Sequence, residues 1–363
     1  MRVVDGIWYG DGLGARAARA LLAPAGWAFG RFAAARNAAY DAGLLRAHDA
    51  ALPTLSLGNL TVGGTGKTPV AAWAVGRLLD AGARPAVVMR GYGDDEPLVH
   101  ERLNPGAIVV ADADRLRGVR RAAERGADCV ILDDAFQHRR IRRDADWLLV
   151  ATEQWRSDLR CLPAGPLRES ASSTSRATLI VVTRKSASRE CAESVAKRLS
   201  ARSGVDASAI VHLAPDGLVD ARTGDRADLT WLRGRAVVGV AAVGVPAAFF
   251  AQLREEGAVV REAKYADHHA FDASDVERIL RSAATADAVV CTLKDAVKLA
   301  PSWPHEGPRL WYVSQRTIVE RGAAVLDVSL ASLLAARTTV AQTAGPAGPS
   351  SPAHGYRSST ADQ

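Results

Sequence analysis

A glycine-rich segment, Gly63-Gly64-Thr65-Gly66-Lys67-Thr68, follows the apolar residues 55–60 and precedes a stretch with helical character. Its small residues let the backbone curl so that successive N–H groups point inward at phosphate oxygens, and the positive end of the following helix favours an anion. The lysine can reach the outer phosphates of a nucleotide, and the threonine hydroxyl can bind Mg²⁺. The segment therefore predicts a phosphate-binding loop between a strand and a helix.

One position departs from the usual loop pattern, which begins with a glycine where this chain has Thr61. Gly63 and Gly64 still keep the segment flexible. A glycine-rich turn without a ligand is the alternative interpretation, and the strand before and the helix after disfavour it. We expect the nucleotide to be bound by Thr61, Val62, Gly63, Gly64, Thr65, Gly66, Lys67 and Thr68.

A second apolar stretch, residues 130–132, ends in Asp133 and Asp134. In phosphate-binding α/β proteins a carboxylate at the end of such a strand holds the Mg²⁺ that bridges the β- and γ-phosphates. Two adjacent aspartates can equally start a turn and cap a helix. Because the glycine-rich loop is also present, we favour the metal role and predict Thr68, Asp133 and Asp134 as the Mg²⁺ ligands.

The segment Thr292-Leu293-Lys294-Asp295 bears on the choice of nucleotide. Ras-type GTPases read guanine with an N/TKxD motif late in the chain, and the spacing of this segment does not fit that motif. We therefore expect ATP to be the nucleotide.

Strands and helices alternate from about residue 52 onward, which predicts a parallel sheet with crossover helices. We predict an α/β fold, in which a P-loop NTPase-like parallel sheet has helices on both faces and a second, smaller, Rossmann-like α/β domain follows. A dinucleotide fingerprint near Gly239 is disfavoured because Ala241 stands in place of its middle glycine. The predicted strands are residues 55–60, 85–89, 107–110, 129–132, 147–150, 178–183 and 236–243, and the predicted domains are residues 46–225 and 226–336.

The two ends of the chain have a different character from the middle. Residues 14–40 combine large apolar and aromatic residues with arginines, which predicts two short amphipathic helices separated near Pro24 and Gly26. Such helices suit an anionic membrane interface, and the alternative is that they cover the protein's own core. We assign residues 1–45 to this segment, and residues 337–363, which are poor in large apolar side chains, to a disordered tail.

The formal net charge of +6 suits a polyanionic partner, either nucleic acid or an acidic membrane surface. The abundance of arginine and alanine could equally reflect the base composition of the genome. No stretch has the roughly 18 apolar residues needed to cross a bilayer, and a signal-peptide core is lacking. The cysteines occur singly, so we expect reduced thiols, no structural zinc and a protein that stays inside the cell. They are Cys129, Cys161, Cys191 and Cys291.

Several motifs together resemble the tetraacyldisaccharide 4′-kinase (lipid A 4′-kinase) family, from the N-terminal helices to about residue 335. The resemblance rests on Gly58-Asn59-Leu60-Thr61-Val62-Gly63-Gly64-Thr65-Gly66-Lys67-Thr68-Pro69, Arg90-Gly91-Tyr92-Gly93, Asp95-Glu96-Pro97, Asp133-Asp134-Ala135-Phe136-Gln137-His138, Leu162-Pro163-Ala164-Gly165-Pro166-Leu167-Arg168-Glu169, Asp267-His268-His269 and Thr292-Leu293-Lys294-Asp295-Ala296-Val297-Lys298.

The resemblance implies transfer of the ATP γ-phosphate to the 4′-hydroxyl of an acylated glucosamine disaccharide 1-phosphate in lipid A synthesis. It also implies that residues 14–40 attach the enzyme peripherally to the cytoplasmic face of the bacterial inner membrane, so that the positive charge serves lipid and not nucleic acid. The alternatives are a P-loop kinase or ligase with a soluble small-molecule substrate, and a nucleotide-dependent switch without transfer chemistry.

Site roles also follow from the resemblance. Asp95 is expected to be the catalytic base, His268 its partner and Lys67 a phosphate-binding catalytic residue. Asp94 is the rival base, because the motif at residues 90–93 nearly abuts Asp95 where the family has a longer insertion. A further departure is Ala135, which replaces a glycine and would shift the turn if the position needed a positive φ. The remaining residues expected to line the site are Glu96, Arg115, Gln137, His138, Arg168 and Glu169.

Overall fold

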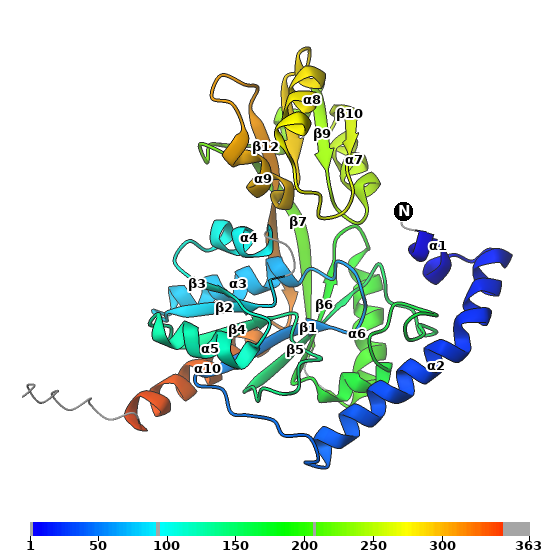
Figure 1. The fold of residues 1–363 in the computed structure, drawn as a ribbon, viewed down its shortest axis with the longest axis vertical. Coiled ribbons are helices and arrows are strands. Elements are labelled where there is room, and N and C mark those ends of the chain that lie inside the picture. Colours follow the sequence, from blue (N-terminus) through cyan, green and yellow to red (C-terminus); the bar gives the residue numbers. More distant parts are fainter. Residues whose placement is uncertain (1–2, 92–94, 206–207, 344–363) are drawn as a thin grey trace, which may run out of the picture.

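The computed structural model describes residues 3–91, 95–205 and 208–343, and within them twelve strands form one sheet (Figure 1). The strands are β1 (Thr54–Asn59), β2 (Pro85–Met89), β3 (Ile108–Ala111), β4 (Cys129–Asp133), β5 (Ala145–Ala151), β6 (Leu179–Arg184), β7 (Ser208–Asp220), β8 (Arg226–Ala227), β9 (Ala236–Ala241), β10 (Val259–Lys264), β11 (Ala288–Cys291) and β12 (Leu310–Arg321). Their order is β10-β9-β11-β12-β7-β6-β5-β1-β4-β2-β3, and β8 pairs with β7 outside this path.

Helices connect the strands and cover the sheet (Figure 1). The α-helices are α1 (Val3–Tyr9), α2 (Leu13–Asp41), α3 (Lys67–Asp80), α4 (Asp95–Leu103), α5 (Arg115–Glu124), α6 (Arg189–Ser203), α7 (Pro246–Glu255), α8 (Ala273–Ala283), α9 (Leu293–Leu299) and α10 (Ala323–Thr343), and the 3₁₀ helices are η1 (Ala171–Arg176), η2 (Leu229–Leu232) and η3 (Ala300–Ser302).

The strands β6, β5, β1, β4, β2 and β3, in this order across the sheet, are all parallel and form a region that is buried on both faces. Their nearly continuous apolar sequences predict this burial. On one face Leu57 and Ile131 pack with the apolar sides of α3 and α10. On the other face Val130 and Leu132 pack with α5, and Leu148 packs with α6. Because successive strand residues point to opposite faces, each strand contributes to both cores.

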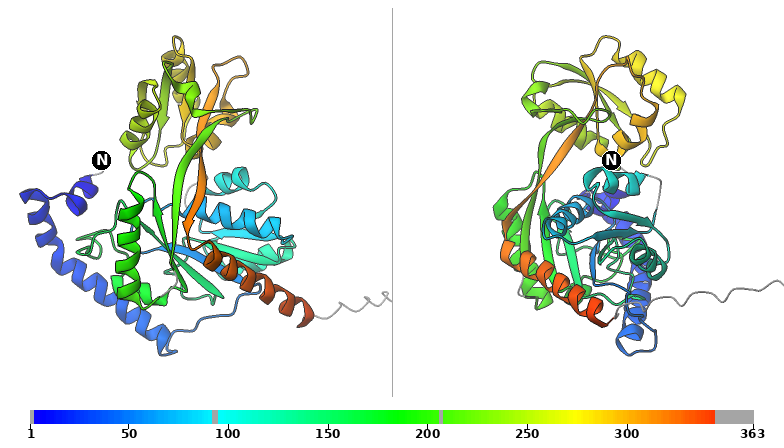
Figure 2. Two further views of the ribbon diagram at one scale, coloured as in Figure 1. Left: turned by 180° about the vertical axis from the view of Figure 1, so that it is seen from behind. Right: turned by 90° about the vertical axis from the view of Figure 1, so that its left-hand side faces the viewer.

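A smaller unit is built on β9, β10 and β11, which are also parallel. Here α8 and α9 cover one face, and α7 and η2 cover the other. The predicted fold class is confirmed, but this unit does not have a sheet of its own. We call the parallel strands β1 to β6 with their helices the P-loop unit. The long strands β7 and β12 form an antiparallel pair that runs from this P-loop unit into the smaller one (Figure 2). Since both strands belong to both units, the predicted boundary between residues 225 and 226 stays a prediction.

The predicted break of the N-terminal segment near Pro24 and Gly26 is wrong, because one continuous helix, α2, contains both residues. Gly26 is buried, and a Cβ at this position would lie 2.9 Å from the Ala164 Cβ and 2.9 Å from the Cys161 carbonyl oxygen. The glycine therefore permits close packing against residues 161–164. Pro24 removes a single backbone hydrogen bond of α2, and the packing at Gly26 compensates for this loss, so the helix continues past the proline.

At the other end, α10 continues to Thr343, beyond residue 337 where the disordered tail was predicted to begin. Its apolar residues Leu326, Leu330 and Leu333 pack into the core beside α3, which explains why the helix forms here. The rest of the predicted tail, residues 344–363, lies outside the described residues. Among the described residues, no helix has the length and apolarity needed to cross a bilayer.

Candidate active site

The loop between β1 and α3 lies at the carboxyl end of β1, in the middle of the P-loop unit. Gly63 and Gly66 have φ values of 128° and 82°, which non-glycine residues rarely adopt. A Cβ at Gly66 would also lie 2.3 Å from the Leu213 Cδ1. These two glycines are therefore required by the backbone path, whereas Gly64 is exposed and has open space around it.

Neighbouring segments hold this loop in place. The Asn59 Nδ2 donates to the Thr65 Oγ1 at 2.9 Å, and the Thr183 Oγ1 donates to the Thr65 carbonyl at 2.8 Å. The Val62 N–H donates to the Pro166 carbonyl at 2.8 Å, so the proline-rich segment braces the start of the loop. Thr61, at the irregular first position, is buried and forms a bridge with Leu167.

The end of β4 brings Asp133 and Asp134 to the loop, because β4 is the parallel neighbour of β1. The Lys67 Nζ lies 3.6 Å from the Asp134 Oδ1. Asp134 has a φ of 51°, so the residue with positive φ in this turn is Asp134 and not Ala135. The alanine that replaces the family's glycine is therefore accommodated without strain. Aspartate tolerates this conformation better than most residues.

Asp133 is buried and accepts two hydrogen bonds. The His100 Nε2 lies 3.1 Å from its Oδ2, and the Asp134 N–H donates to its Oδ1 at 2.9 Å. Burial alone would raise the pKa of Asp133, but the hydrogen bond and charge of His100, together with the charge of Lys67, lower it below the usual value. The carboxylate is therefore held in its ionised form.

A second group of charged residues joins the two units. Asp95, at the start of α4, is buried, and the His268 Nδ1 lies 3.2 Å from its Oδ2. His268 precedes α8 in the smaller unit and has a φ of 60°. From α9, the Lys298 Nζ lies 3.9 Å from the same Asp95 oxygen. The rival base Asp94 lies outside the described residues.

The two charged groups are connected through α4. Asp95 begins this helix, and His100 further along it contacts Asp133. Burial raises the pKa of Glu96, and the nearby carboxylates of Asp133 and Asp95 raise it further, whereas Lys294 opposes the shift. The pKa of Glu96 is therefore affected by both charged groups.

Comparisons with known proteins decide the family. The profile of the family described as tetraacyldisaccharide-1-P 4′-kinase matches residues 18–334. A tetraacyldisaccharide 4′-kinase of Anaeromyxobacter dehalogenans (strain 2CP-C) is 36% identical, over 91% of this chain and 95% of its own length. Another of that name, from Halorhodospira halophila (strain DSM 244 / SL1), is 33% identical over 85% of this chain and 91% of its own. The chain belongs to this family.

A solved structure supports the fold. LpxK from Aquifex aeolicus, whose crystal structure is described as a complex with ATP, matches with a TM-score of 0.69 and 24% identity, over 87% of this chain and 99% of that one. Membership of the tetraacyldisaccharide-1-P 4′-kinase family makes the chain a kinase of lipid A synthesis. The resemblance predicted from the motifs is confirmed, and the soluble-substrate alternative is not favoured.

The other predicted lining residues of this kinase divide into two sets. The Arg168 Nη1 donates to both carboxylate oxygens of Asp134, at 2.8 and 3.0 Å, and the Gln137 Nε2 donates to the Asn59 carbonyl at 2.9 Å. The buried Arg115 lies 3.4 Å from the Asp133 carbonyl through its Nη2, and burial lowers its pKa. These residues surround the end of β4.

Glu169 and His138 have other surroundings. The carboxylate of Glu169 accepts from Arg176 at 2.9 and 3.0 Å and from the α2 residue Asn37 at 2.5 Å. Its contacts are thus with α2 and η1. Burial, with the charge of Arg115, lowers the pKa of His138 to about 4.

His100 and Lys298 belong to this site, and the sequence motifs assigned no role to either. His100 lies on the buried side of α4 with Asp95 and Val99, so a polar residue at a core-facing helix position was the available signal. Lys298 occurs in one of the family motifs. Among the described residues, no group of three or more His, Cys, Asp or Glu side chains has the arrangement of a metal site.

Proposed function

We propose that this kinase transfers the γ-phosphate of ATP to the 4′-hydroxyl of an acylated glucosamine disaccharide 1-phosphate, with Asp95 as the proton acceptor. The observation that carries the proposal is the contact between Asp95 and His268, which joins the two units beside the helix that reaches Asp133. ATP as the donor agrees with the phosphate-binding loop and with the complex described for the Aquifex aeolicus LpxK.

The roles follow from the chemistry of the transfer. A bond forms between the 4′-oxygen and the γ-phosphorus, the bond from that phosphorus to the β–γ bridging oxygen breaks, and ADP leaves. The sugar hydroxyl is a poor nucleophile near neutral pH, so a carboxylate that takes its proton helps the attack. His268 orients Asp95, and Lys67 offsets the charge of the phosphates. Positioning and charge stabilisation supply most of the acceleration.

The residues at the end of β4 and the start of α3 suit Mg²⁺. Thr68, Asp133 and Asp134 offer a hydroxyl and two carboxylates, which are oxygen ligands of the kind this ion prefers, and the pKa of Asp133 is lowered. Mg²⁺ commonly takes one or two carboxylates and completes its shell with water and substrate phosphates, so a larger protein cage is not needed. When bound, it would offset the negative charge of the β- and γ-phosphates. Glu96, Arg115, Gln137, His138 and Arg168 would line this region, and Glu169 would act through its contact with α2.

The acceptor would reach the site from a membrane surface along α2. Leu21, Trp27 and Phe32 are 82%, 71% and 71% exposed on this helix, whereas Gly26 and Asn37 are buried. Exposed large apolar side chains accompanied by arginines suit the interface of an anionic bilayer. We place this interface at the cytoplasmic face of the bacterial inner membrane.

The test is a transfer assay with γ-labelled ATP, Mg²⁺ and detergent-dispersed acyl disaccharide 1-phosphate. Label should appear in the lipid, and Lys67→Ala should abolish its appearance. Asp95→Asn should lower kcat by about 10²- to 10⁴-fold, the usual contribution of a general base, with little change in KM for ATP. Absence of label in the lipid contradicts the acceptor, and a loss in Asp94→Asn instead of Asp95→Asn contradicts the choice of base.

A further inference from the structure

Lys298 lies at the junction of the two units and is mostly removed from water, with 13% of its side chain exposed. Its Nζ donates to the His269 carbonyl at 2.9 Å and lies 3.6 Å from the Asp295 Oδ1 and 3.9 Å from the Asp95 Oδ2. The ammonium also lies 5.3 Å from the ring centre of Phe271. An ammonium with so little exposure requires such partners, because its loss of hydration is costly.

Three of these partners, His269, Asp295 and Phe271, lie in the smaller unit and fix the lysine there. Asp295 is fully buried, and its carboxylate accepts from the Thr292 Oγ1 at 2.7 Å and from the Ala242 N–H at 3.1 Å. The strand β9 and the helix α9 therefore hold Asp295, and Asp295 holds Lys298. The remaining partner, Asp95, comes from the P-loop unit.

The Asp95 Oδ2 is thus approached by two groups of the smaller unit, the His268 imidazole at 3.2 Å and the Lys298 ammonium at 3.9 Å. Because both groups come from the smaller unit, they fix the position of the Asp95 carboxylate relative to that unit. The His268 Nδ1 also lies 3.4 Å from the other oxygen, Oδ1, so His268 contacts both oxygens and Lys298 adds a second group to Oδ2.

We propose that Lys298 is a positioning residue for the reaction, which holds the Asp95 carboxylate in a fixed orientation when the smaller unit lies against the P-loop unit. The inference rests on the proposed role of Asp95. In this role Lys298 does not contact the phosphates of ATP. Its loss should therefore lower the rate of transfer and leave ATP binding almost unchanged.

The experiment compares Lys298→Met, Lys298→Arg and Asp95→Asn in the full chain by kcat and by KM for ATP. Lys298→Met should lower kcat by about 10- to 100-fold, as expected for a misplaced catalytic group, with KM for ATP changed by less than about twofold. Lys298→Arg keeps the charge and should recover most of kcat. Lys264→Met removes an exposed lysine of the same unit, and this control should keep the full rate.

Lys298→Met leaves Asp295 buried without its cation, so the double variant Lys298→Met/Asp295→Asn is measured as well. It should restore thermal stability but not kcat. Recovery of kcat in the double variant, or a normal kcat in Lys298→Met, overturns the inference. If Asp95→Asn keeps the wild-type rate, the proposed base is wrong, and this result is distinct from a failure confined to Lys298.

Discussion

The pKa values of two acidic residues of the site, Asp133 and Glu96, are shifted in opposite directions. Asp133 is buried but keeps a lowered pKa because His100 and Lys67 compensate its charge. Glu96 is half-buried next to other carboxylates, and its pKa is raised because this partial burial and these charges both oppose ionisation. Neighbouring acidic groups with opposite shifts are typical of sites in which charge and proton transfer must be separated.

The lowered pKa of His138 can be tested through the pH dependence of the protein's stability. Its pKa is about 4 in the folded chain, against about 6.5 when unfolded, because the ring is largely buried and lies near Arg115 and Arg143. The unfolded state therefore binds more protons between these two values, so the stabilising contribution is complete above pH 6.5 and falls as the pH decreases toward 4.

We expect the wild type to lose about 1–2 kcal/mol more stability than His138→Gln between pH 7 and pH 5. A full shift is worth about 1.4 kcal/mol per pKa unit, and the ring is only partly shielded from solvent. Urea denaturation at pH 7, 6 and 5 measures the difference. If the free energies of unfolding of the wild type and of His138→Gln change equally between pH 7 and pH 5, the lowered pKa of His138 is contradicted.

The sequence predicted the loop and the strand-end aspartates for a physical reason. Lys67 and Asp133 follow two apolar strands, and the carboxyl ends of parallel strands meet at one edge of a sheet. The pair of Asp95 and His268 could not be derived in this way, because 173 positions separate them along the chain. Only the family resemblance suggested that pair. Neither the strand pattern nor the resemblance assigned a role to His100.

At the scale of elements, α2 shows that local signals can be overridden by packing. Pro24 and Gly26 predicted a break, yet Gly26 is the residue that allows the helix to lie against residues 161–164. Farther along, Asn37 bonds to Glu169, and Arg36 donates to the Gln137 carbonyl at 2.8 Å. The helix is thus fastened to two residues that are predicted to line the site, and it runs along the outside of the molecule (Figure 2).

The exposed apolar side chains of α2 lead to a prediction about membranes. In the triple variant Leu21→Ser/Trp27→Ser/Phe32→Ser, binding to vesicles that contain anionic lipid should weaken by at least about tenfold, because each buried large apolar side chain contributes roughly 1.5–3 kcal/mol. Co-sedimentation with the vesicles measures the loss. The melting temperature should stay unchanged, since these side chains are exposed in the folded chain.

Val259→Ser is the matched control, because Val259 is 66% exposed on the smaller unit and away from α2. It should leave vesicle binding unchanged. Equal binding of the triple variant and the wild type would show that α2 does not mediate the association.

At the scale of the whole molecule, the shared sheet was the feature that the sequence did not reveal. The strand β7 contains Pro215 and Gly217, which are unfavourable in strands, and the register of β12 shifts between Ser314 and Gln315. Such irregular strands lack a regular apolar alternation. Tertiary pairing nevertheless makes them the long antiparallel connection between the units.

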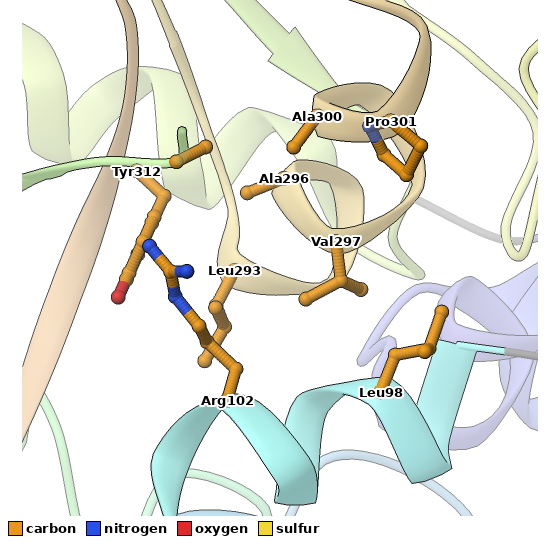
Figure 3. Close-up of a pocket in the computed structure, with 9 residues that line it drawn as sticks. Leu98, Arg102, Leu293, Ala296, Val297, Ala300, Pro301 and Tyr312 are labelled. Carbon is orange, nitrogen blue, oxygen red and sulfur yellow. The ribbon is translucent and has the colours of Figure 1, made fainter. Parts of the chain in front are cut away.

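Beside this connection, a cavity of about 230 Å³ lies between parts of α4 and α9, and these two helices also pack against each other (Figure 3). Leu98 and Arg102 line it from α4, and Ala296 and Ala300 line it from the segment of the smaller unit that contains α9. Since α4 begins with Asp95 and α9 carries Lys298, the space lies between the elements that assemble the proposed base. We expect the smaller unit to move toward the P-loop unit into this space when substrates bind.

We expect Ala300→Phe to fill this cavity and hinder that movement. It should lower kcat by about tenfold, which corresponds to roughly 1.4 kcal/mol in the barrier, while the melting temperature stays equal or rises because apolar space is filled. Ala300→Ser keeps the cavity and should retain the wild-type rate. Steady-state kinetics and thermal melting measure these effects. A wild-type kcat in Ala300→Phe would mean that transfer does not require α9 to approach α4. A lowered melting temperature would mean that the loss of rate comes from a destabilised fold.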